Sequence, residues 1–149
     1  MKHNFEKYAR DANIFLNELA KKLGHPEEKD RTYIVLRSVL HTLRDRITIS
    51  ESLNLIAQLP MFMKAIYVDD WKYMEKPVRM NNVEEFNKYV ENEQAKYGET
   101  EFNWQKSTTE IVQISIGQLS RYVSEGEIKD ILAQMPEELN ELFVEAVGH

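Results

Sequence analysis

Apolar residues recur every three or four positions along most of the chain, which is the spacing of one face of an α-helix. The first such segment follows Asn4 and runs from Phe5 to Leu23. Gly24 is typical of the residue just after a helix, and Pro26 cannot continue one. A second helix is predicted from about Glu27 to Arg46, with a buried stripe formed by Tyr33, Leu36, Val39, Leu40, Leu43 and Ile47.

Two shorter helices are predicted next, separated by a proline. Thr48-Ile49-Ser50-Glu51 has the capping-box pattern, in which the Thr side chain and the Glu side chain each accept a hydrogen bond from a free backbone N–H. The helix that follows is predicted to turn Leu53, Ile56, Ala57 and Leu59 inward. Pro60 has no N–H and ends that helix, so Met61 to Tyr67 are predicted to form a separate one.

The second half of the chain is predicted to be helical in the same way. Val68 to Asn82 show no clear period and are interpreted as a connection. A fifth helix is predicted from Val83 to near Gly98, and a sixth from Phe102 or Trp104 to about Arg121. Ser124-Glu125-Gly126-Glu127 repeats the capping-box pattern before a seventh helix, and a final helix is predicted after Pro136. The pattern therefore predicts an all-α protein of seven to eight helices.

The two halves of the chain resemble each other. At an offset of 76 positions, residues 43–60 align with residues 119–136, with five identities among 18 positions. The matches include the predicted caps, the apolar stripe and the helix-breaking prolines, which favours an internal duplication. We therefore predict two tandem, pseudo-symmetric helical-bundle lobes, residues 1–70 and 83–149, joined by residues 71–82 and able to pack as one domain. Gln58 and its counterpart Gln134 are expected to cap or cross-bridge helices.

Charge and composition narrow the possible functions. The 149 residues carry a net charge of −6, and no cysteine is present. Residues 1–75 carry 12 basic and 11 acidic side chains, whereas residues 76–149 carry 7 and 14, so the acidic character lies in the second half. A net negative charge disfavours nucleic-acid binding. No stretch approaches the roughly 18 apolar residues of a membrane span. We expect a cytoplasmic protein without a membrane association.

Few residues suggest chemistry, and each has a structural alternative. Arg44-Asp45-Arg46 closes the second helix, where cations are favourable but an acid is not. Asp45 either pairs locally, with the turn or with an arginine, or contacts a ligand or partner. Asp70 and Trp71 lie near Tyr67 at the predicted junction between the lobes, where aromatic side chains either fill the seam or bind a ligand.

Signatures of catalysis and of metal binding are weak or missing in the sequence. His41 and Asp45 are four residues apart on one helix face, but two more metal ligands would be needed. No catalytic triad, phosphate-binding glycine loop or nucleotide motif is found. We therefore predict no catalytic residues, no metal and no cofactor.

Three motifs carry a resemblance to a known family. They are Leu43–Ile47 (LRDRI), Ala57–Pro60 (AQLP) and Tyr67–Trp71 (YVDDW). In this order the chain resembles the bacterial family of unknown function numbered 2267, in which glycine is common at the positions of Ala65 and Asp70. The resemblance implies a small helical protein of the bacterial cytosol and no established activity.

Two hypotheses for function follow. The first is a non-enzymatic binding or interaction module, with a protein partner or a second copy of the chain as its ligand. The alternative is a protein, or an enzyme of unknown reaction, that binds a small molecule in a groove between the lobes. The candidate contact residues for either are Arg44, Asp45, Arg46, Tyr67, Asp70 and Trp71.

Overall fold

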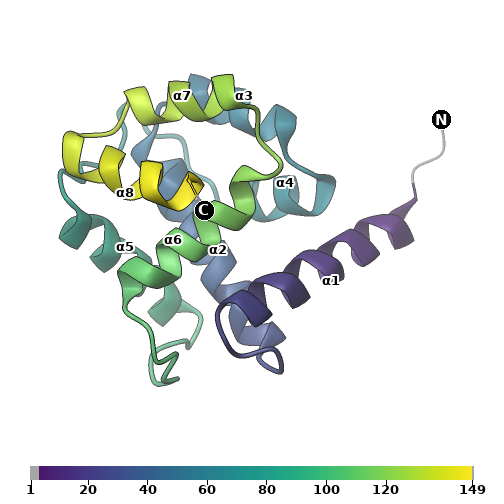
Figure 1. The fold of residues 1–149 in the computed structure, drawn as a ribbon. Helices are drawn as coiled ribbons and strands as arrows, with labels where there is room; N and C mark the ends of the chain where they lie inside the picture. Colours follow the sequence, from purple (N-terminus) through teal and green to yellow (C-terminus); the bar gives the residue numbers. More distant parts are fainter. Residues whose placement is uncertain (1–3, 149) are drawn as a thin grey trace.

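A computed structural model describes residues 4–148, and this part of the chain contains eight α-helices and no strand (Figure 1). The all-α prediction is confirmed. The helices are α1 (Phe5–Lys22), α2 (Lys29–Arg46), α3 (Ile49–Gln58), α4 (Met61–Val68), α5 (Val83–Lys96), α6 (Thr108–Ser120), α7 (Glu125–Ala133) and α8 (Glu137–Val147).

Local capping explains where most helices begin. The side chains of Asn4, Thr48, Asn82 and Ser124 each accept a hydrogen bond from the backbone N–H three residues later. These bonds satisfy N–H groups that the first turn of a helix leaves free. Gly24, just after α1, adopts a φ of +85°, a left-handed conformation that glycine adopts without strain.

The predicted start of the sixth helix is wrong. Helix α6 begins at Thr108, because Gln105 has a φ of +59°, which interrupts a right-handed helix. Ser107 and Glu110 then form a complete capping box, a signal that the sequence contains but that the apolar pattern from Trp104 obscured. Trp104 is nevertheless buried, as part of the loop that precedes α6.

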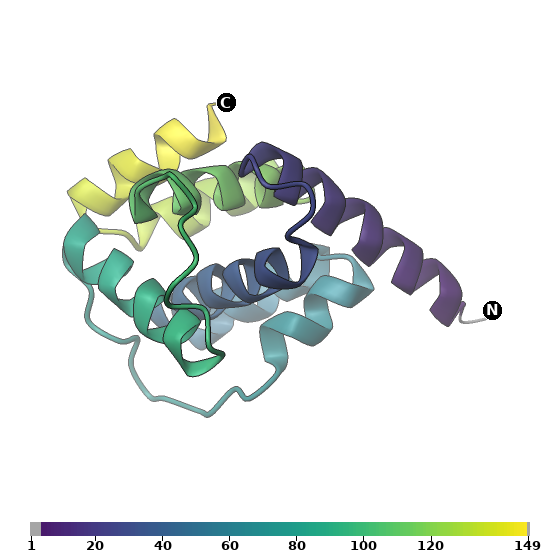
Figure 2. The same ribbon diagram turned by 90° about the horizontal axis from the view of Figure 1, so that it is seen from below.

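Helix α2 runs through the centre of the molecule and packs against α1, α4, α5 and α6 (Figure 2). Its predicted apolar stripe is buried, apart from Tyr33, which is half-buried. Helices cover α2 on several sides, so its burial extends beyond the predicted stripe. Four of its charged or titratable side chains are buried as well: Arg37, His41, Arg44 and Asp45.

Helices α3 and α7 lie side by side on one side of the molecule (Figure 1). The predicted inward face of α3 is partly wrong. Leu53 is 59% exposed and Ala57 also faces solvent, whereas Leu55 is fully buried. Contact between α3 and α7 accounts for the difference. Helix α7 covers an edge of α3 that includes Glu51, so the buried face of α3 is not the one predicted.

Reciprocal hydrogen bonds connect the two halves at this seam. The Gln134 side-chain oxygen accepts from the backbone N–H of Thr48 at 2.9 Å, and Gln58 accepts from that of Ser124 at 2.7 Å. The cross-bridging role predicted for both glutamines is confirmed. The predicted capping boxes are only half formed, because each glutamine occupies the N–H that a glutamate of the same helix would accept from. The buried core includes residues of both halves, and the division into lobes stays a prediction.

Candidate ligand-binding site

The last turn of α2 holds the segment that follows α4. Arg44 donates from Nη1 to the backbone carbonyls of Tyr67, at 2.9 Å, and Asp69, at 3.1 Å. The backbone carbonyl of Asp45 accepts from the N–H of Val78 at 2.7 Å. One residue on, Arg46 Nε donates to the carbonyl of Met80 at 3.1 Å. Three consecutive residues thus fix three points of the connection, and the two arginines do so with their side chains.

His41 contributes a further contact one turn earlier. Its Nε2 lies 2.7 Å from the carbonyl oxygen of Ile66, so Nε2 carries the proton and donates it. Burial lowers the pKa of His41, and the nearby Arg44 and Arg37 lower it further, so the ring is neutral at pH 7. Neutral imidazole with a protonated Nε2 has its acceptor lone pair on Nδ1.

Asp45 is a buried carboxylate with two side-chain donors. Arg44 Nε lies 3.0 Å from Oδ1, and the Tyr89 hydroxyl of α5 donates to Oδ2 at 2.5 Å. Burial and the hydrogen bond to Asp45 raise the pKa of Tyr89, so this hydroxyl stays protonated and keeps its role as a donor. In the structure Asp45 therefore pairs with an arginine, as its structural alternative predicted.

Arg37 extends this polar row along α2 by two turns. Its guanidinium donates to the Asp69 carboxylate and to the Tyr97 hydroxyl, both at 2.7 Å, and lies over the Tyr97 ring. The hydrogen bond from Arg37 lowers the pKa of Asp69. Arg37, His41 and Arg44 therefore all contact the last turn of α4 or the residue after it, where free carbonyls favour cationic and donor groups.

The aromatic side chains at this junction have separate environments. Tyr67 is fully buried and its hydroxyl pairs with that of Ser52 at 2.7 Å. Trp71 packs edge-on against Tyr67 and lies beneath the Arg44 guanidinium, 5.8 Å from ring centre to Cζ. Asp70 has a φ of +56°, a conformation that favours glycine and that Asp tolerates better than most residues.

A pocket of about 200 Å³ opens between α2, the N-terminal part of the connection and α5, and we call it the α2–α5 pocket. Its buried floor consists of ionisable side chains from the two helices: His41, Arg44, Asp45 and Glu93. Its rim is more exposed and includes Asp70, Lys72, Met74, Tyr89, Lys96 and Tyr97.

The predicted site residues divide around this pocket. Arg44, Asp45 and Asp70 line it. Tyr67 is buried away from solvent and Arg46 binds the connection at Met80. Trp71 lines a separate small cavity of about 20 Å³.

Sequence reasoning did not identify the contribution of α5 to the pocket. Tyr89, Glu93, Lys96 and Tyr97 line it at the spacing of one helix face. That spacing was available in the sequence, but nothing in it indicated that this face lies against the polar side of α2.

Comparison with known proteins agrees with the motifs. Residues 12–142 match the model of a family described as an uncharacterized conserved protein (DUF2267). The match covers most of the chain and confirms the resemblance inferred from the three motifs. No curated protein matches the chain.

Proposed function

The chain belongs to the DUF2267 family, whose description names no activity, and from the geometry we propose that it binds a small polar molecule in the α2–α5 pocket. The observation that carries the proposal is the buried, ionisable floor of this pocket. Arg44, Asp45 and Glu93 are each 5–7% exposed and His41 is 3% exposed. Removing such groups from water costs free energy, and a cluster of them that lines a cleft is a candidate functional site.

The charges that line the pocket indicate the class of ligand. The lining has three cations, Arg44, Lys72 and Lys96, and three anions, Asp45, Asp70 and Glu93. Arg44 pairs with Asp45 at 3.0 Å and Lys96 with Glu93 at 3.4 Å, so a ligand would join or replace these pairs. Because His41 is neutral, the lining has no net charge, yet it offers strong donors and strong acceptors at close range. A ligand with one ammonium and one carboxylate group would pair with both kinds.

The size of the pocket limits the ligand to a few atoms beyond its charged groups. About 200 Å³ is well above the roughly 10–15 Å³ that a cavity needs to hold one water molecule. This is room for a molecule of amino-acid size. A nucleotide or a peptide of several residues would extend beyond the rim.

A thermal-shift screen with matched analogues tests this function. The panel contains zwitterionic amino acids, the same molecules as carboxamides, and simple amines and carboxylates. At a concentration of 100 Kd a ligand bound only by the native state adds about 2.7 kcal/mol to the free energy of unfolding. For a chain of this length that corresponds to a rise in Tm of roughly 5–10 °C.

Two lysines of α5 provide the matched variants. Lys96 lines the pocket, whereas Lys88 is exposed on the same helix and does not line it. We expect Lys96→Met to weaken binding of the best zwitterion at least tenfold and Lys88→Met to leave it unchanged. If no zwitterion on the panel shifts Tm, or if Lys96→Met binds as well as the unchanged protein, the proposal is wrong.

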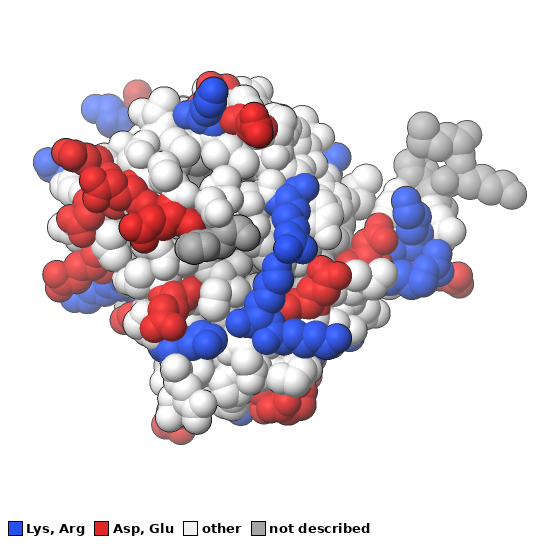
Figure 3. All heavy atoms as spheres, viewed as in Figure 1, with Lys and Arg blue, Asp and Glu red and all other residues white. Residues whose placement is uncertain are grey.

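Self-association is a second candidate, supported by the surface. The first turns of α1 extend away from the body of the molecule in both ribbon views, and Phe5 there is 77% exposed (Figures 1 and 2). Acidic side chains gather over α8, while basic ones form a stripe nearer α1 (Figure 3). A second copy could bring unlike charges together.

Light scattering at low and high salt tests self-association. A dimer held by these charges is expected to dissociate as salt increases. A monomer under both conditions would exclude this candidate. Phe5→Ser is the variant expected to weaken a dimer formed through α1.

The proposed setting is the cytosol. No helix within residues 4–148 is long and apolar enough to cross a membrane. The absence of cysteine is compatible with a reducing compartment, which supports this part of the proposal without depending on the ligand.

A further inference from the structure

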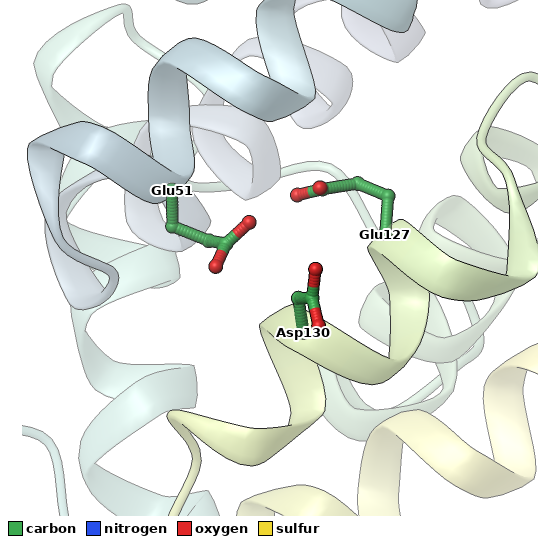
Figure 4. A group of neighbouring side chains, drawn as sticks. All are labelled: Glu51, Glu127 and Asp130. Atoms are coloured by element: carbon green, nitrogen blue, oxygen red, sulfur yellow. The ribbon is translucent and has the colours of Figure 1, made fainter.

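Three carboxylates converge at the seam between α3 and α7, away from the α2–α5 pocket. Glu51 extends from α3, and Glu127 and Asp130 extend from α7, with their carboxylate oxygens directed toward one another (Figure 4). One oxygen of each lies within 4.8 Å of the others. Glu51 and Glu127 are 76 positions apart, so they are counterparts in the predicted duplication.

The cross-bridging glutamines leave the two glutamates without their usual role. In a capping box the glutamate would accept from the N–H of the capping residue. Here Gln134 occupies the N–H of Thr48, and Gln58 occupies that of Ser124. Both glutamate side chains are directed into the seam instead.

Buried oxygens without a partner are the independent sign of a missing ligand. Glu127 is only 5% exposed and its Oε2 is fully enclosed; outside the cluster no described residue donates a hydrogen bond to its side chain, and within it only a proton shared with Glu51 can do so. Glu51 is 9% exposed, and its Oε2 is enclosed and unpaired in the same way. Its other oxygen accepts a single long hydrogen bond, from Gln134 Nε2 at 3.3 Å.

The cost of this arrangement is high without a counter-charge. Burial, the hydrogen bond with Glu51 and the Glu51 charge raise the pKa of Glu127 to about 8, so without a cation a proton neutralises this carboxyl at pH 7, and a bound cation would displace it. No cationic side chain forms an ion pair with Glu51, Glu127 or Asp130 among the ion pairs of residues 4–148. A buried carboxylate of this kind is ordinarily stabilised by pairing or by coordinating a metal.

We propose that Glu51, Glu127 and Asp130 bind a single Ca²⁺ ion, which joins the two halves of the chain at the α3–α7 seam. Calcium binds carboxylate oxygens at about 2.3–2.6 Å and takes six to eight ligands, including water. Two oxygens on opposite sides of the ion are therefore at most about 4.6–5.2 Å apart. The three carboxylate oxygens lie within 4.8 Å of one another, which is close enough for all three to share one ion.

The composition of the site favours calcium over magnesium. Mg²⁺ demands a near-ideal octahedron at about 2.0–2.1 Å and gives up its waters reluctantly, whereas Ca²⁺ accepts carboxylates in a flexible shell. Asp130 is exposed, which gives the ion a route from solvent and leaves positions for water. With only three protein carboxylates, the affinity is expected to be in the range of roughly 10⁻⁵ to 10⁻³ M rather than that of a dedicated calcium buffer.

Isothermal titration calorimetry with CaCl₂ on the full chain, at constant ionic strength, tests the site. We expect one ion per chain, and at least tenfold weaker binding of MgCl₂. Glu127→Gln and Glu51→Gln keep the side-chain shape and remove the charge, so each is expected to weaken calcium binding at least tenfold. Glu125→Gln removes an exposed charge from the same turn of α7, outside the cluster, and is expected to bind calcium as before.

Stability measurements separate a cation site from a proton shared by the two glutamates. CaCl₂ is expected to raise the Tm of the unchanged protein and of Glu125→Gln, and not that of Glu127→Gln. Asp130→Asn, at an exposed position that does not endanger folding, is expected to show an intermediate loss. No calcium-dependent rise in the unchanged protein, or an equal rise in Glu127→Gln, overturns the proposal and leaves a shared proton as the neutralising group.

Discussion

The hydrogen bond between the hydroxyls of Tyr67 and Ser52 can be removed from either side, which makes it a direct test of how α3 and α4 are held together. Both side chains are fully buried, and the two oxygens are 2.7 Å apart. Burial raises the pKa of Tyr67, so its hydroxyl remains protonated throughout the accessible pH range. Neither hydroxyl has another hydrogen-bond partner within residues 4–148.

Each single substitution is expected to be costly. Tyr67→Phe leaves the Ser52 hydroxyl unpaired, and Ser52→Ala leaves the Tyr67 hydroxyl unpaired. An unsatisfied buried hydroxyl costs about 1–3 kcal/mol. The double variant removes both polar groups and leaves none unpaired, so its loss of stability is expected to be about 0–1 kcal/mol. The coupling free energy between the two sites is then at least about 1 kcal/mol.

Urea denaturation of the four proteins, followed by circular dichroism, measures this cycle. Additive single and double effects would show that the two hydroxyls do not depend on each other, and the reasoning would be wrong. The second half of the chain supplies a control, because Phe143 and Ile128 stand 76 positions after Tyr67 and Ser52. Phe143→Tyr places a hydroxyl in an apolar site and is expected to cost about 1–3 kcal/mol.

Three further expectations follow from single contacts. A Cβ at Gly117 would lie 2.9 Å from the Ala146 carbonyl oxygen, so Gly117→Ala is expected to lower the free energy of unfolding by about 1–3 kcal/mol in urea denaturation. Gly126→Ala is the control, because a Cβ there would have no atom within 4 Å, and it should not destabilise the protein. Arg44→Gln leaves a buried carboxylate and two backbone carbonyls without their cation, and a loss of about 3–5 kcal/mol is expected; a loss under 1 kcal/mol would contradict the contacts described. Burial lowers the pKa of His41 in the folded protein. As pH falls below 6.5, the imidazole therefore takes up a proton in the unfolded chain before it does so in the folded protein, and the free energy of unfolding decreases. His41→Gln should reduce this decline in thermal melts between pH 7 and pH 5, and an unchanged pH dependence would show that His41 is not responsible.

Elements that depend on neighbouring residues could be predicted from the sequence. The caps at Thr48 and Ser124 and the breaks at Pro60 and Pro136 depend on groups within one turn of the helix, and each lies where the pattern indicated. Even the missed start of α6 had a local signal, the capping box of Ser107 and Glu110. Apolar periodicity is equally local, since it records which face of a helix avoids water.

Burial of polar groups depended on partners distant in sequence and could not be predicted. Sequence spacing showed Arg44 at a helix end but not the carbonyls of Tyr67 and Asp69, which accept its hydrogen bonds. The pocket floor required Glu93 of α5 to meet α2, and no pattern within either helix specifies that meeting.

The sequence by itself thus determined the helices, their ends and the family, because these follow from short-range hydrogen bonds and from the period of apolar residues. Only the tertiary structure decided which polar side chains leave water. Glu51 and Glu127 illustrate the difference, because each looks like a capping residue in sequence and is directed into a shared seam in the structure. A charge can be buried only where other groups satisfy it, and those groups are brought together by packing rather than by proximity along the chain.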